Sequence, residues 1–92
     1  MPGETPPRDE IKIERLGEKL RAIRQRAGLS LDQMAACLGR TEEARRSRVR
    51  EWEIGRRIPN LVTILRYARF AGISTDILLD DALDLPPPED QD

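Results

Sequence analysis

Hydrogen-bond donors are concentrated between residues 45 and 50. The stretch contains four arginines and a serine: Arg45, Arg46, Ser47, Arg48 and Arg50. The guanidinium group of arginine is planar and charged, so it suits paired hydrogen bonds to guanine O6 and N7, and equally suits phosphate oxygens. On one exposed helix surface, this set indicates contact with nucleic acid. The alternative is a solvated helix that binds nothing.

The net charge of −1 conceals an uneven distribution along the chain. Residues 15–70 hold fourteen Lys and Arg against six acids, a net charge of +8. Residues 1–14 carry −2, and residues 71–92 carry −7. A local excess of this size on a small domain attracts polyanions. Charged side chains that only solvate helix surfaces would give the same totals, so the asymmetry favours a nucleic-acid partner without requiring one.

The residue types that are missing exclude several other chemistries. There is no His, which excludes a His-containing zinc site and the common Ser/His/Asp and Cys/His nucleophilic systems. The single cysteine, Cys37, excludes an internal disulfide, and its apolar neighbours predict a small buried residue rather than a redox sensor. No phosphate-binding glycine loop is present. We therefore expect a protein that is not an enzyme and that uses no metal or cofactor.

The chain also lacks the pattern of a membrane protein. No apolar run approaches the ~18 residues that suggest a transmembrane helix, and the polar, proline-rich N-terminus does not resemble a signal peptide. We expect a cytoplasmic, nucleoid-associated protein without membrane contact.

The elements that must position the arginines are all predicted to be helices. Apolar residues recur at spacings of three and four over residues 13–27, 31–38, 42–53, 61–71 and 75–79. A glycine follows each of the first four segments and is suited to end a helix. Ser30 with Gln33 forms a capping box, and Thr41 and Ser74 are candidate caps for the third and fifth helices. The predicted fold class is an all-α, compact five-helix domain.

The inner faces of these helices follow from the same spacing. In the first helix they comprise Ile13, Leu16, Leu20, Ile23 and Ala27, and in the fourth helix Leu61, Ile64, Leu65 and Ala68.

The ends of the chain differ in composition from the middle. Residues 1–12 are predicted to be a flexible N-terminal segment, residues 13–79 the folded domain, and residues 80–92 an acidic, proline-rich tail that is mostly disordered. Leu83 and Leu85 are the only larger apolar residues of the tail and are candidates for docking. An acidic tail of this kind either solubilises the protein or covers its basic helix.

The second and third helices together suggest a helix-turn-helix. Their apolar residues, Met34, Ala35, Leu38, Val49 and Trp52, would fix the two helices at a set angle when buried. The arginine-bearing side of the third helix would then face outward, where it fits the major groove of DNA.

Several motifs occur in the same order as in a known family. They are LGEKLR at 16–21, a run from Arg24 to Ser30, Met34-Ala35 with Leu38-Gly39, EIGRRIP at 53–59, and the segment 61–79. The chain resembles the phage repressor and Cro family of helix-turn-helix proteins, also called xenobiotic-response-element-like or lambda-repressor-like. The resemblance implies a five-helix DNA-binding domain whose third helix reads bases in double-stranded DNA.

The resemblance also implies roles for individual residues. Base edges would be contacted by Arg46, Ser47, Arg50 and Glu51. Phosphates would be contacted by Arg45, Arg48, Arg56 and Arg57. Leu31 stands where the family commonly has a phosphate-binding glutamine, so either Gln33 substitutes or the contact is absent. Arg24 and Glu53 would form a structural salt bridge that orients the third helix.

The chain departs from the family between Gly39 and Glu53, where it has about four additional residues around positions 41–44. These residues either add a turn to the third helix or lengthen the loop before it.

The proteins that the chain resembles suggest two functions. The first is a transcriptional regulator, such as a repressor of bacterial or phage type, acting as a homodimer on a palindromic operator. Its dimer contacts are predicted at Val62, Phe70, Ile77 and Leu79, with Tyr67 and Phe70 serving either a partner surface or the core. The second is an antitoxin or adaptor of the same fold, whose C-terminal tail contacts a partner protein.

Overall fold

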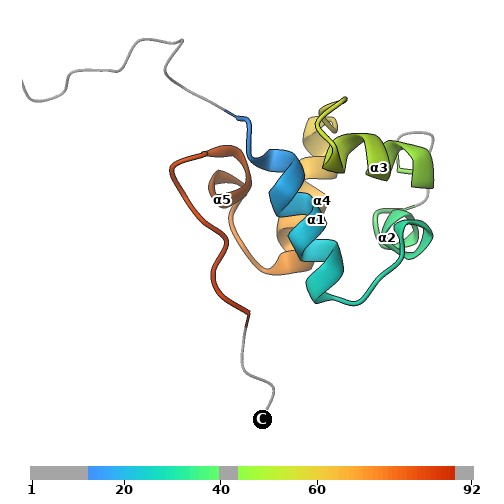
Figure 1. Ribbon diagram of the computed structural model, residues 1–92. Helices are drawn as coiled ribbons and strands as arrows, with labels where there is room; N and C mark the ends of the chain where they lie inside the picture. The colour runs from blue at the N-terminus through green and yellow to red at the C-terminus, as the bar shows by residue number, and fades with distance from the viewer. Residues whose placement is uncertain (1–12, 40–43, 89–92) are drawn as a thin grey trace, which may run out of the picture.

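The computed structural model describes residues 13–39 and 44–88, and these residues form five α-helices. In chain order the helices are α1 (Leu16–Arg26), α2 (Leu31–Cys37), α3 (Arg46–Glu53), α4 (Leu61–Ala71) and α5 (Thr75–Leu79). No strand occurs in the described ranges, and the prediction of an all-α fold is confirmed. Figure 1 shows α1 and α4 in the middle, with α2 and α3 on one side and α5 on the other. None of the described helices has the length and apolar character needed to cross a membrane.

The core is centred on Trp52 of α3 and Tyr67 of α4, both of which are buried. Their rings meet edge to face, with centroids 6.2 Å apart and an interplanar angle of 77°, which is a favoured aromatic arrangement. The predicted burial of Trp52 is confirmed, and Tyr67 belongs to the core rather than to a partner surface. The other buried apolar side chains are Leu16, Leu20, Ile23, Met34, Ala35, Leu38, Ala44, Val49, Ile64, Ala68 and Leu78.

Local hydrogen bonds explain where several helices begin. The capping box predicted for α2 is present: Ser30 Oγ accepts from the Gln33 amide, and Gln33 Oε1 accepts from the Ser30 amide. Asn60 caps α4 by accepting a hydrogen bond from the Thr63 amide. Ser74 is the N-cap residue of α5, as predicted, but its side chain makes no cap hydrogen bond. The predicted cap Thr41 lies outside the described residues.

Two helices start later than predicted. Helix α1 begins at Leu16 rather than at residue 13. Arg15 is its N-cap residue, and the amides of Glu14 and Arg15 donate to the carboxylate of Asp81. Helix α3 begins at Arg46 rather than at residue 42. Arg45 has an extended backbone, with φ −140° and ψ 166°, and Ala44 is buried in the core. Residues 44 and 45 therefore belong to the connection before α3 rather than to an additional helical turn.

Three predictions of burial were also wrong. The inner face of α4 is formed by Ile64, Tyr67 and Ala68, whereas Leu61 and Leu65 are 80% and 42% exposed. Leu61 and Leu65 lie on a neighbouring row of the helix, which the apolar spacing alone did not distinguish from the buried row. Cys37 is exposed, because Met34, Ala35 and Leu38 define the inner side of α2 and Cys37 lies outside that stripe. At the ends of the first predicted helix, Ile13 and Ala27 are exposed.

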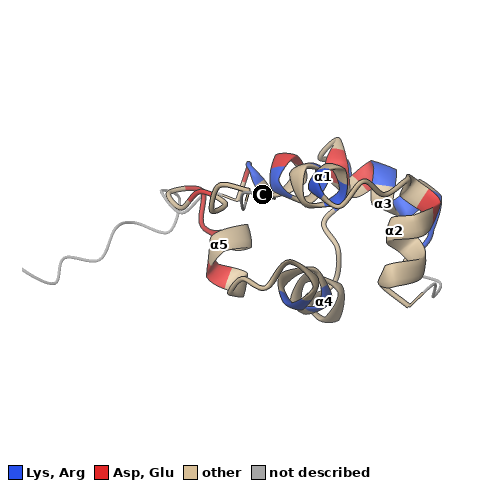
Figure 2. Cartoon of the chain, turned by 90° about the horizontal axis from the view of Figure 1, so that it is seen from below, with Lys and Arg blue, Asp and Glu red and all other residues tan. Residues whose placement is uncertain are grey.

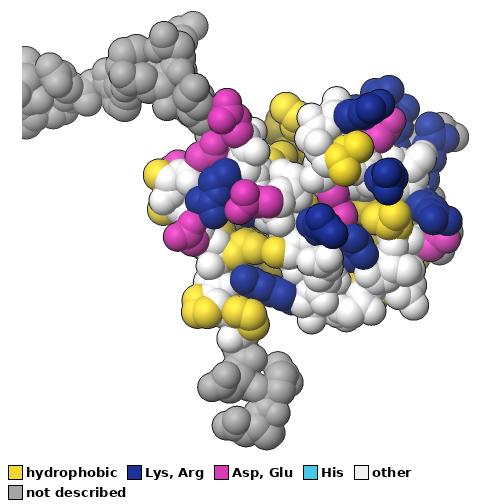
Figure 3. All heavy atoms as spheres, viewed as in Figure 1, with side chains coloured by type: hydrophobic (Ala, Val, Ile, Leu, Met, Phe, Trp, Pro, Cys, Tyr) yellow, Lys and Arg dark blue, Asp and Glu magenta, His cyan; other side chains and the backbone are white. Residues whose placement is uncertain are grey.

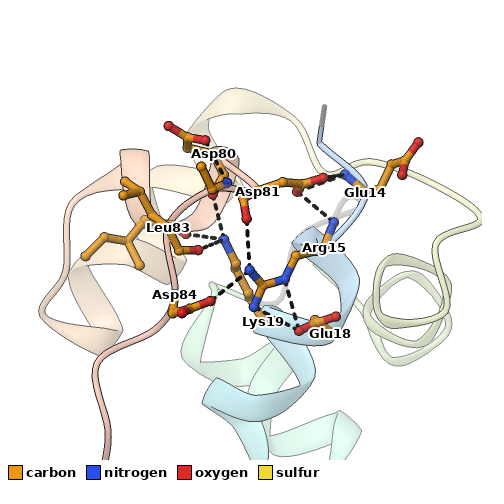
Figure 4. A network of polar contacts seen from close by, with 10 residues as sticks. Glu14, Arg15, Glu18, Lys19, Asp80, Asp81, Leu83 and Asp84 are labelled. Atoms are coloured by element: carbon orange, nitrogen blue, oxygen red, sulfur yellow. Dashed lines mark hydrogen bonds and ion pairs between the residues drawn. The ribbon is translucent and has the colours of Figure 1, made fainter. Parts of the chain in front are cut away.

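The segment after α5 packs against α1. Asp81 accepts hydrogen bonds from the amides of Glu14 and Arg15, and the Arg15 guanidinium donates to the main-chain oxygen of Asp81 and pairs with Asp84 (Figure 4). Farther along, the Arg26 guanidinium donates to the carbonyl of Pro86 at 2.7 Å. The expectation of disorder after Asp80 therefore does not hold for residues 80–88.

Lys19 holds this segment from inside the protein. Its side chain is 1% exposed, and its Nζ donates to three main-chain oxygens, those of Ile77, Asp80 and Leu83, at 2.7, 2.9 and 2.7 Å. Three acceptors are the full capacity of an ammonium group, so the buried charge is completely hydrogen-bonded. Leu85, farther along the segment, packs against the core.

Candidate nucleic-acid interface

Helix α3 presents its polar residues outward and its apolar residues inward. Val49 and Trp52 are buried, whereas Arg46, Ser47 and Arg50 are exposed. The three exposed residues provide guanidinium and hydroxyl donors on one side of the helix. Figure 3 shows that most of the Lys and Arg side chains on the visible face gather on the half of the molecule that contains α3.

The remaining arginines with predicted phosphate contacts lie around this helix. Arg45 is exposed and immediately precedes α3. The sequence had placed it within the helix. Arg56 and Arg57 are exposed in the turn after the helix, and Arg48 is partly buried on the helix itself. The structure thus brings together the predicted base-reading and phosphate-contacting arginines on and beside one short helix.

A salt bridge fixes the end of α3 against α1. Arg24 Nε lies 2.7 Å from Glu53 Oε2, and Arg24 Nη2 lies 3.0 Å from Glu53 Oε1, which makes the contact bidentate. Arg24 also donates to the carbonyl of Leu29 at 2.9 Å. The side chain of Glu53 is only 5% exposed, and its hydrogen bonds raise the pKa of Arg24 above the usual value. This is the pair implied by the family resemblance, and it holds α3 in one orientation.

Gly17 permits the close approach of the same two helices. A Cβ atom at this position would lie 2.6 Å from the carbonyl oxygen of Glu53 and 2.8 Å from that of Trp52. Both distances are shorter than a van der Waals contact and involve main-chain atoms, which cannot rotate away. The α1–α3 contact therefore requires glycine at position 17.

Glu51 is engaged by two arginines. Its Oε1 lies 2.9 Å from Arg57 Nε and 3.8 Å from Arg48 Nη1. Its main-chain oxygen accepts hydrogen bonds from the amides of Arg56 and Arg57 after a turn at Gly55, where φ is +82°. A residue predicted to read bases thus also neutralises two predicted phosphate contacts.

The remaining predicted contact residues have different surroundings. Gln33 is exposed, but its side-chain oxygen is used in the capping box of α2, which competes with a contact to phosphate.

The predicted dimer residue Leu79 is partly buried against the core, and Ile77 is also partly buried. Val62, in contrast, is 60% exposed. Phe70 is exposed and lines an open hollow of about 780 Å³ between the ends of α1 and α4 and residues 85–88.

The sequence contained signals for some interactions that were missed. Lys19 follows Leu16 by three residues and precedes Ile23 by four, so it lies on the buried side of α1, and this spacing indicated its burial. Arg48 and Glu51 are three residues apart on one helix, which is a recognised spacing for an ion pair. The contact of Arg57 with Glu51 had no such signal, because it depends on the turn at Gly55.

The described part of the acidic tail does not cover α3. In Figures 1 and 2, α5 and the segment that follows it lie at the end of the molecule opposite to α2 and α3. Residues 89–92 lie outside the described part of the chain. For residues 80–88, the alternative in which the tail shields the basic helix is therefore wrong.

Two successive helices, α2 and α3, pack against each other and leave the polar side of the second exposed, which is the arrangement of a helix-turn-helix protein. The family model described as "Helix-turn-helix domain" matches residues 15–82. The chain belongs to this family, whose fold suggests DNA binding. Searches among curated proteins and among solved structures gave no match.

Proposed function

We propose that this protein is a sequence-specific DNA-binding transcriptional regulator that inserts α3 into the major groove. The observation that carries the proposal is the exposure of Arg46, Ser47 and Arg50 on a helix held rigidly by Trp52 and by the salt bridge of Glu53. The residues near the start of a recognition helix are those that contact base edges in helix-turn-helix complexes. The proposed function needs no catalytic group, metal or cofactor.

The exposed arginines divide into two proposed roles. Arg46 and Arg50 are four residues apart on α3 and point away from the core, so they suit contacts with base edges. Arg45 precedes the helix and Arg56 and Arg57 follow it, positions that suit contacts with the sugar–phosphate backbones of the groove. Phosphate contacts of this kind orient the helix without reading sequence.

We further propose that the protein acts as a homodimer on a palindromic operator. Exposed apolar residues continue from the end of α3 into α4: Ile54, Ile58, Leu61, Val62 and Leu65. Exposed apolar side chains gathered in one segment of the chain suit an interaction site. A second copy is the occupant we propose, because a contact that adjoins the end of α3 would place two recognition helices near one axis. Two half-sites would then lie ~34 Å apart, one turn of DNA.

This dimer surface shares only Val62 with the residues predicted from the sequence. It can be tested by sedimentation of the wild type and of a Leu61→Ser, Val62→Ser double variant, with and without DNA. Both residues are exposed, so the variant should fold normally. We expect it to bind half-sites as a monomer. A wild type that remains monomeric on its operator would contradict the homodimer.

The regulator itself is tested by selecting bound duplexes from a random DNA pool. We expect a motif with two-fold symmetry, which would give the operator and the oligomeric state together. A purified protein that binds no duplex at low ionic strength would disprove the proposed function.

The alternative, an antitoxin or adaptor that uses its C-terminal tail, has less support. Leu85 packs against the core, and the main-chain oxygens of Asp80, Leu83 and Pro86 accept hydrogen bonds from α1. A partner that bound residues 80–86 would have to replace these contacts. We therefore favour the regulator.

A further inference from the structure

We propose that Glu51 is a specificity-determining residue that exchanges partners on DNA. In the unbound protein its carboxylate neutralises Arg57 and Arg48. At the correct site, a cytosine amino group donates a hydrogen bond to the carboxylate. Both arginines are then free to bind phosphates. The inference rests on the major-groove binding by α3 proposed above, and it specifies how that surface distinguishes correct from incorrect DNA.

The ion pairs of Glu51 join the two parts of the interface. Arg48 belongs to α3, and Arg57 belongs to the turn that follows it, yet both contact the same oxygen, Oε1. The three side chains together carry a charge of +1 rather than +2. The carboxylate thus removes part of the positive charge from the surface that would meet DNA.

The position of Glu51 on α3 allows its carboxylate to meet a base edge. Glu51 lies four residues after the exposed Ser47, so the two residues lie on one row of the helix, on the side away from Val49 and Trp52. In the major groove, cytosine presents its N4 amino group as a donor that a carboxylate can accept. Adenine also has an amino donor, N6, but the acceptor N7 lies beside it and repels a carboxylate, whereas guanine O6 and N7, thymine O4 and the phosphates present only acceptors.

The main chain holds the turn independently of the Glu51 carboxylate. The main-chain oxygen of Glu51 accepts from the amide of Arg56 at 2.9 Å and from that of Arg57 at 3.4 Å. Gly55 adopts the left-handed backbone that this turn requires. Changing only the carboxylate should therefore leave Arg57 beside α3 but without its counter-ion.

The ion pairs are weak enough for DNA to replace them. The side chains of Arg57 and Glu51 are 54% and 32% exposed, and pairs in such surroundings change an equilibrium by up to about fivefold. On incorrect DNA, Glu51 either keeps its arginines or stands unpaired near phosphates, and both outcomes weaken binding. On correct DNA, the cytosine amino group donates a hydrogen bond to the Glu51 carboxylate, which replaces the lost ion pairs. Glu51 therefore opposes incorrect sites more than the correct one.

The test compares Glu51→Gln with the wild type on the duplex selected by the wild type and on a random-sequence duplex, over a range of salt concentrations. For the variant we expect about three- to tenfold tighter binding to random DNA, since each of two weak pairs is removed. Its salt dependence on random DNA should steepen by about one unit for each arginine released. It should also lose the preference for the C·G pair that faces residue 51.

Glu18→Gln is a matched control. Glu18 of α1 pairs at 3.3 Å with Arg15, the N-cap residue three positions earlier, so this variant makes the same change in net charge and removes a pair of the same spacing. We expect its base preference to equal that of the wild type. In an Arg57→Gln background, the effect of Glu51→Gln on random DNA should shrink by several-fold, because one of the released arginines is missing.

Three results would overturn the proposal. One is equal weakening of both duplexes by Glu51→Gln, which would make Glu51 a structural support. Another is equal tightening with an unchanged base preference, which would leave only a net-charge effect. The third is an undiminished effect in the Arg57→Gln background. A wild type that binds no DNA would instead disprove the proposed function, and it is recognised without any variant.

Discussion

The ammonium group of Lys19 lies inside the protein, 2.7 Å from the carbonyl oxygen of Leu83. The two residues are 64 positions apart, and their contact joins the first helix to the segment that follows the last one. A residue of a type that ordinarily faces water thus holds the segment after α5 against α1.

We expect Lys19→Met to lower the free energy of unfolding by about 3–5 kcal/mol, because three partly buried carbonyls lose a charged donor while the side-chain volume is kept. Urea unfolding followed by circular dichroism measures the change. Arg21→Met, an exposed position on the same helix, should stay within about 0.5 kcal/mol of the wild type. Equal midpoints for the two variants would show that the Lys19 contacts contribute no stability.

Asp81 should make part of the stability depend on pH. Desolvation alone would raise the pKa of Asp81, but hydrogen bonds from the amides of Glu14 and Arg15, with the charges of Lys19 and Arg15, outweigh it and lower the pKa. The folded state therefore binds this proton less readily than the unfolded state does. Its stabilising contribution is present above the ordinary value of 3.8 and is lost as the pH falls through the lower folded pKa.

Asp81→Asn tests this dependence through thermal unfolding at several pH values, from neutral pH to below the ordinary Asp pKa. The variant should be less stable than the wild type at neutral pH, and the difference should narrow as the solution becomes more acidic. A difference that stays constant over the whole range would contradict the assignment.

Gly17→Ala should destabilise the protein although alanine is the better helix former. The new Cβ would lie 2.6 Å from the Glu53 carbonyl oxygen, so α1 and α3 must separate. We expect a loss of about 1–3 kcal/mol, typical of overpacking, together with weaker DNA binding. Gly72→Ala is the comparison, because its Cβ meets nothing within 4 Å and only the left-handed backbone, with φ +70°, is strained. Its DNA affinity should be unchanged when measured well below the melting temperature.

Arg46→Ala and Arg56→Ala should separate base contacts from phosphate contacts. Arg46→Ala should cost about 1–3 kcal/mol on the selected operator and relax the preference at one base pair. Arg56→Ala should weaken binding to all duplexes alike and reduce the salt slope by about one unit. Titrations of operator and random DNA at several salt concentrations distinguish these results. Equal losses on both duplexes for Arg46→Ala would show that it does not read bases.

The parts of the fold that depend on neighbouring residues were predictable from the sequence. Ser30 and Gln33 are three residues apart, and their reciprocal capping is a property of one helical turn. Met34, Leu38, Val49 and Trp52 follow the helical period, and all four are buried as predicted. The family motifs implied the contact between Arg24 and Glu53. The roles of the exposed arginines in binding DNA stay predictions.

Contacts between distant residues were not predictable in the same way. Asp81 reaches the amide of Arg15, the residue before α1, across 66 positions of sequence. Composition alone marked the same segment as disordered, because acids and prolines are common in it. Apolar spacing in α4 selected Leu61 and Leu65, but the packing of α4 in the core left both exposed and buried Tyr67 instead.

The amino-acid sequence by itself determined five helical segments, their main apolar faces and a strongly basic central region, because periodicity and charge are properties of neighbouring residues. Only the tertiary structure decided which main-chain oxygens Lys19 binds, that residues 80–88 pack along α1, and that Arg57 reaches Glu51. Each of these depends on the relative placement of elements. Hydrogen bonds and ion pairs act over only a few ångströms, so their partners are known once the chain is folded.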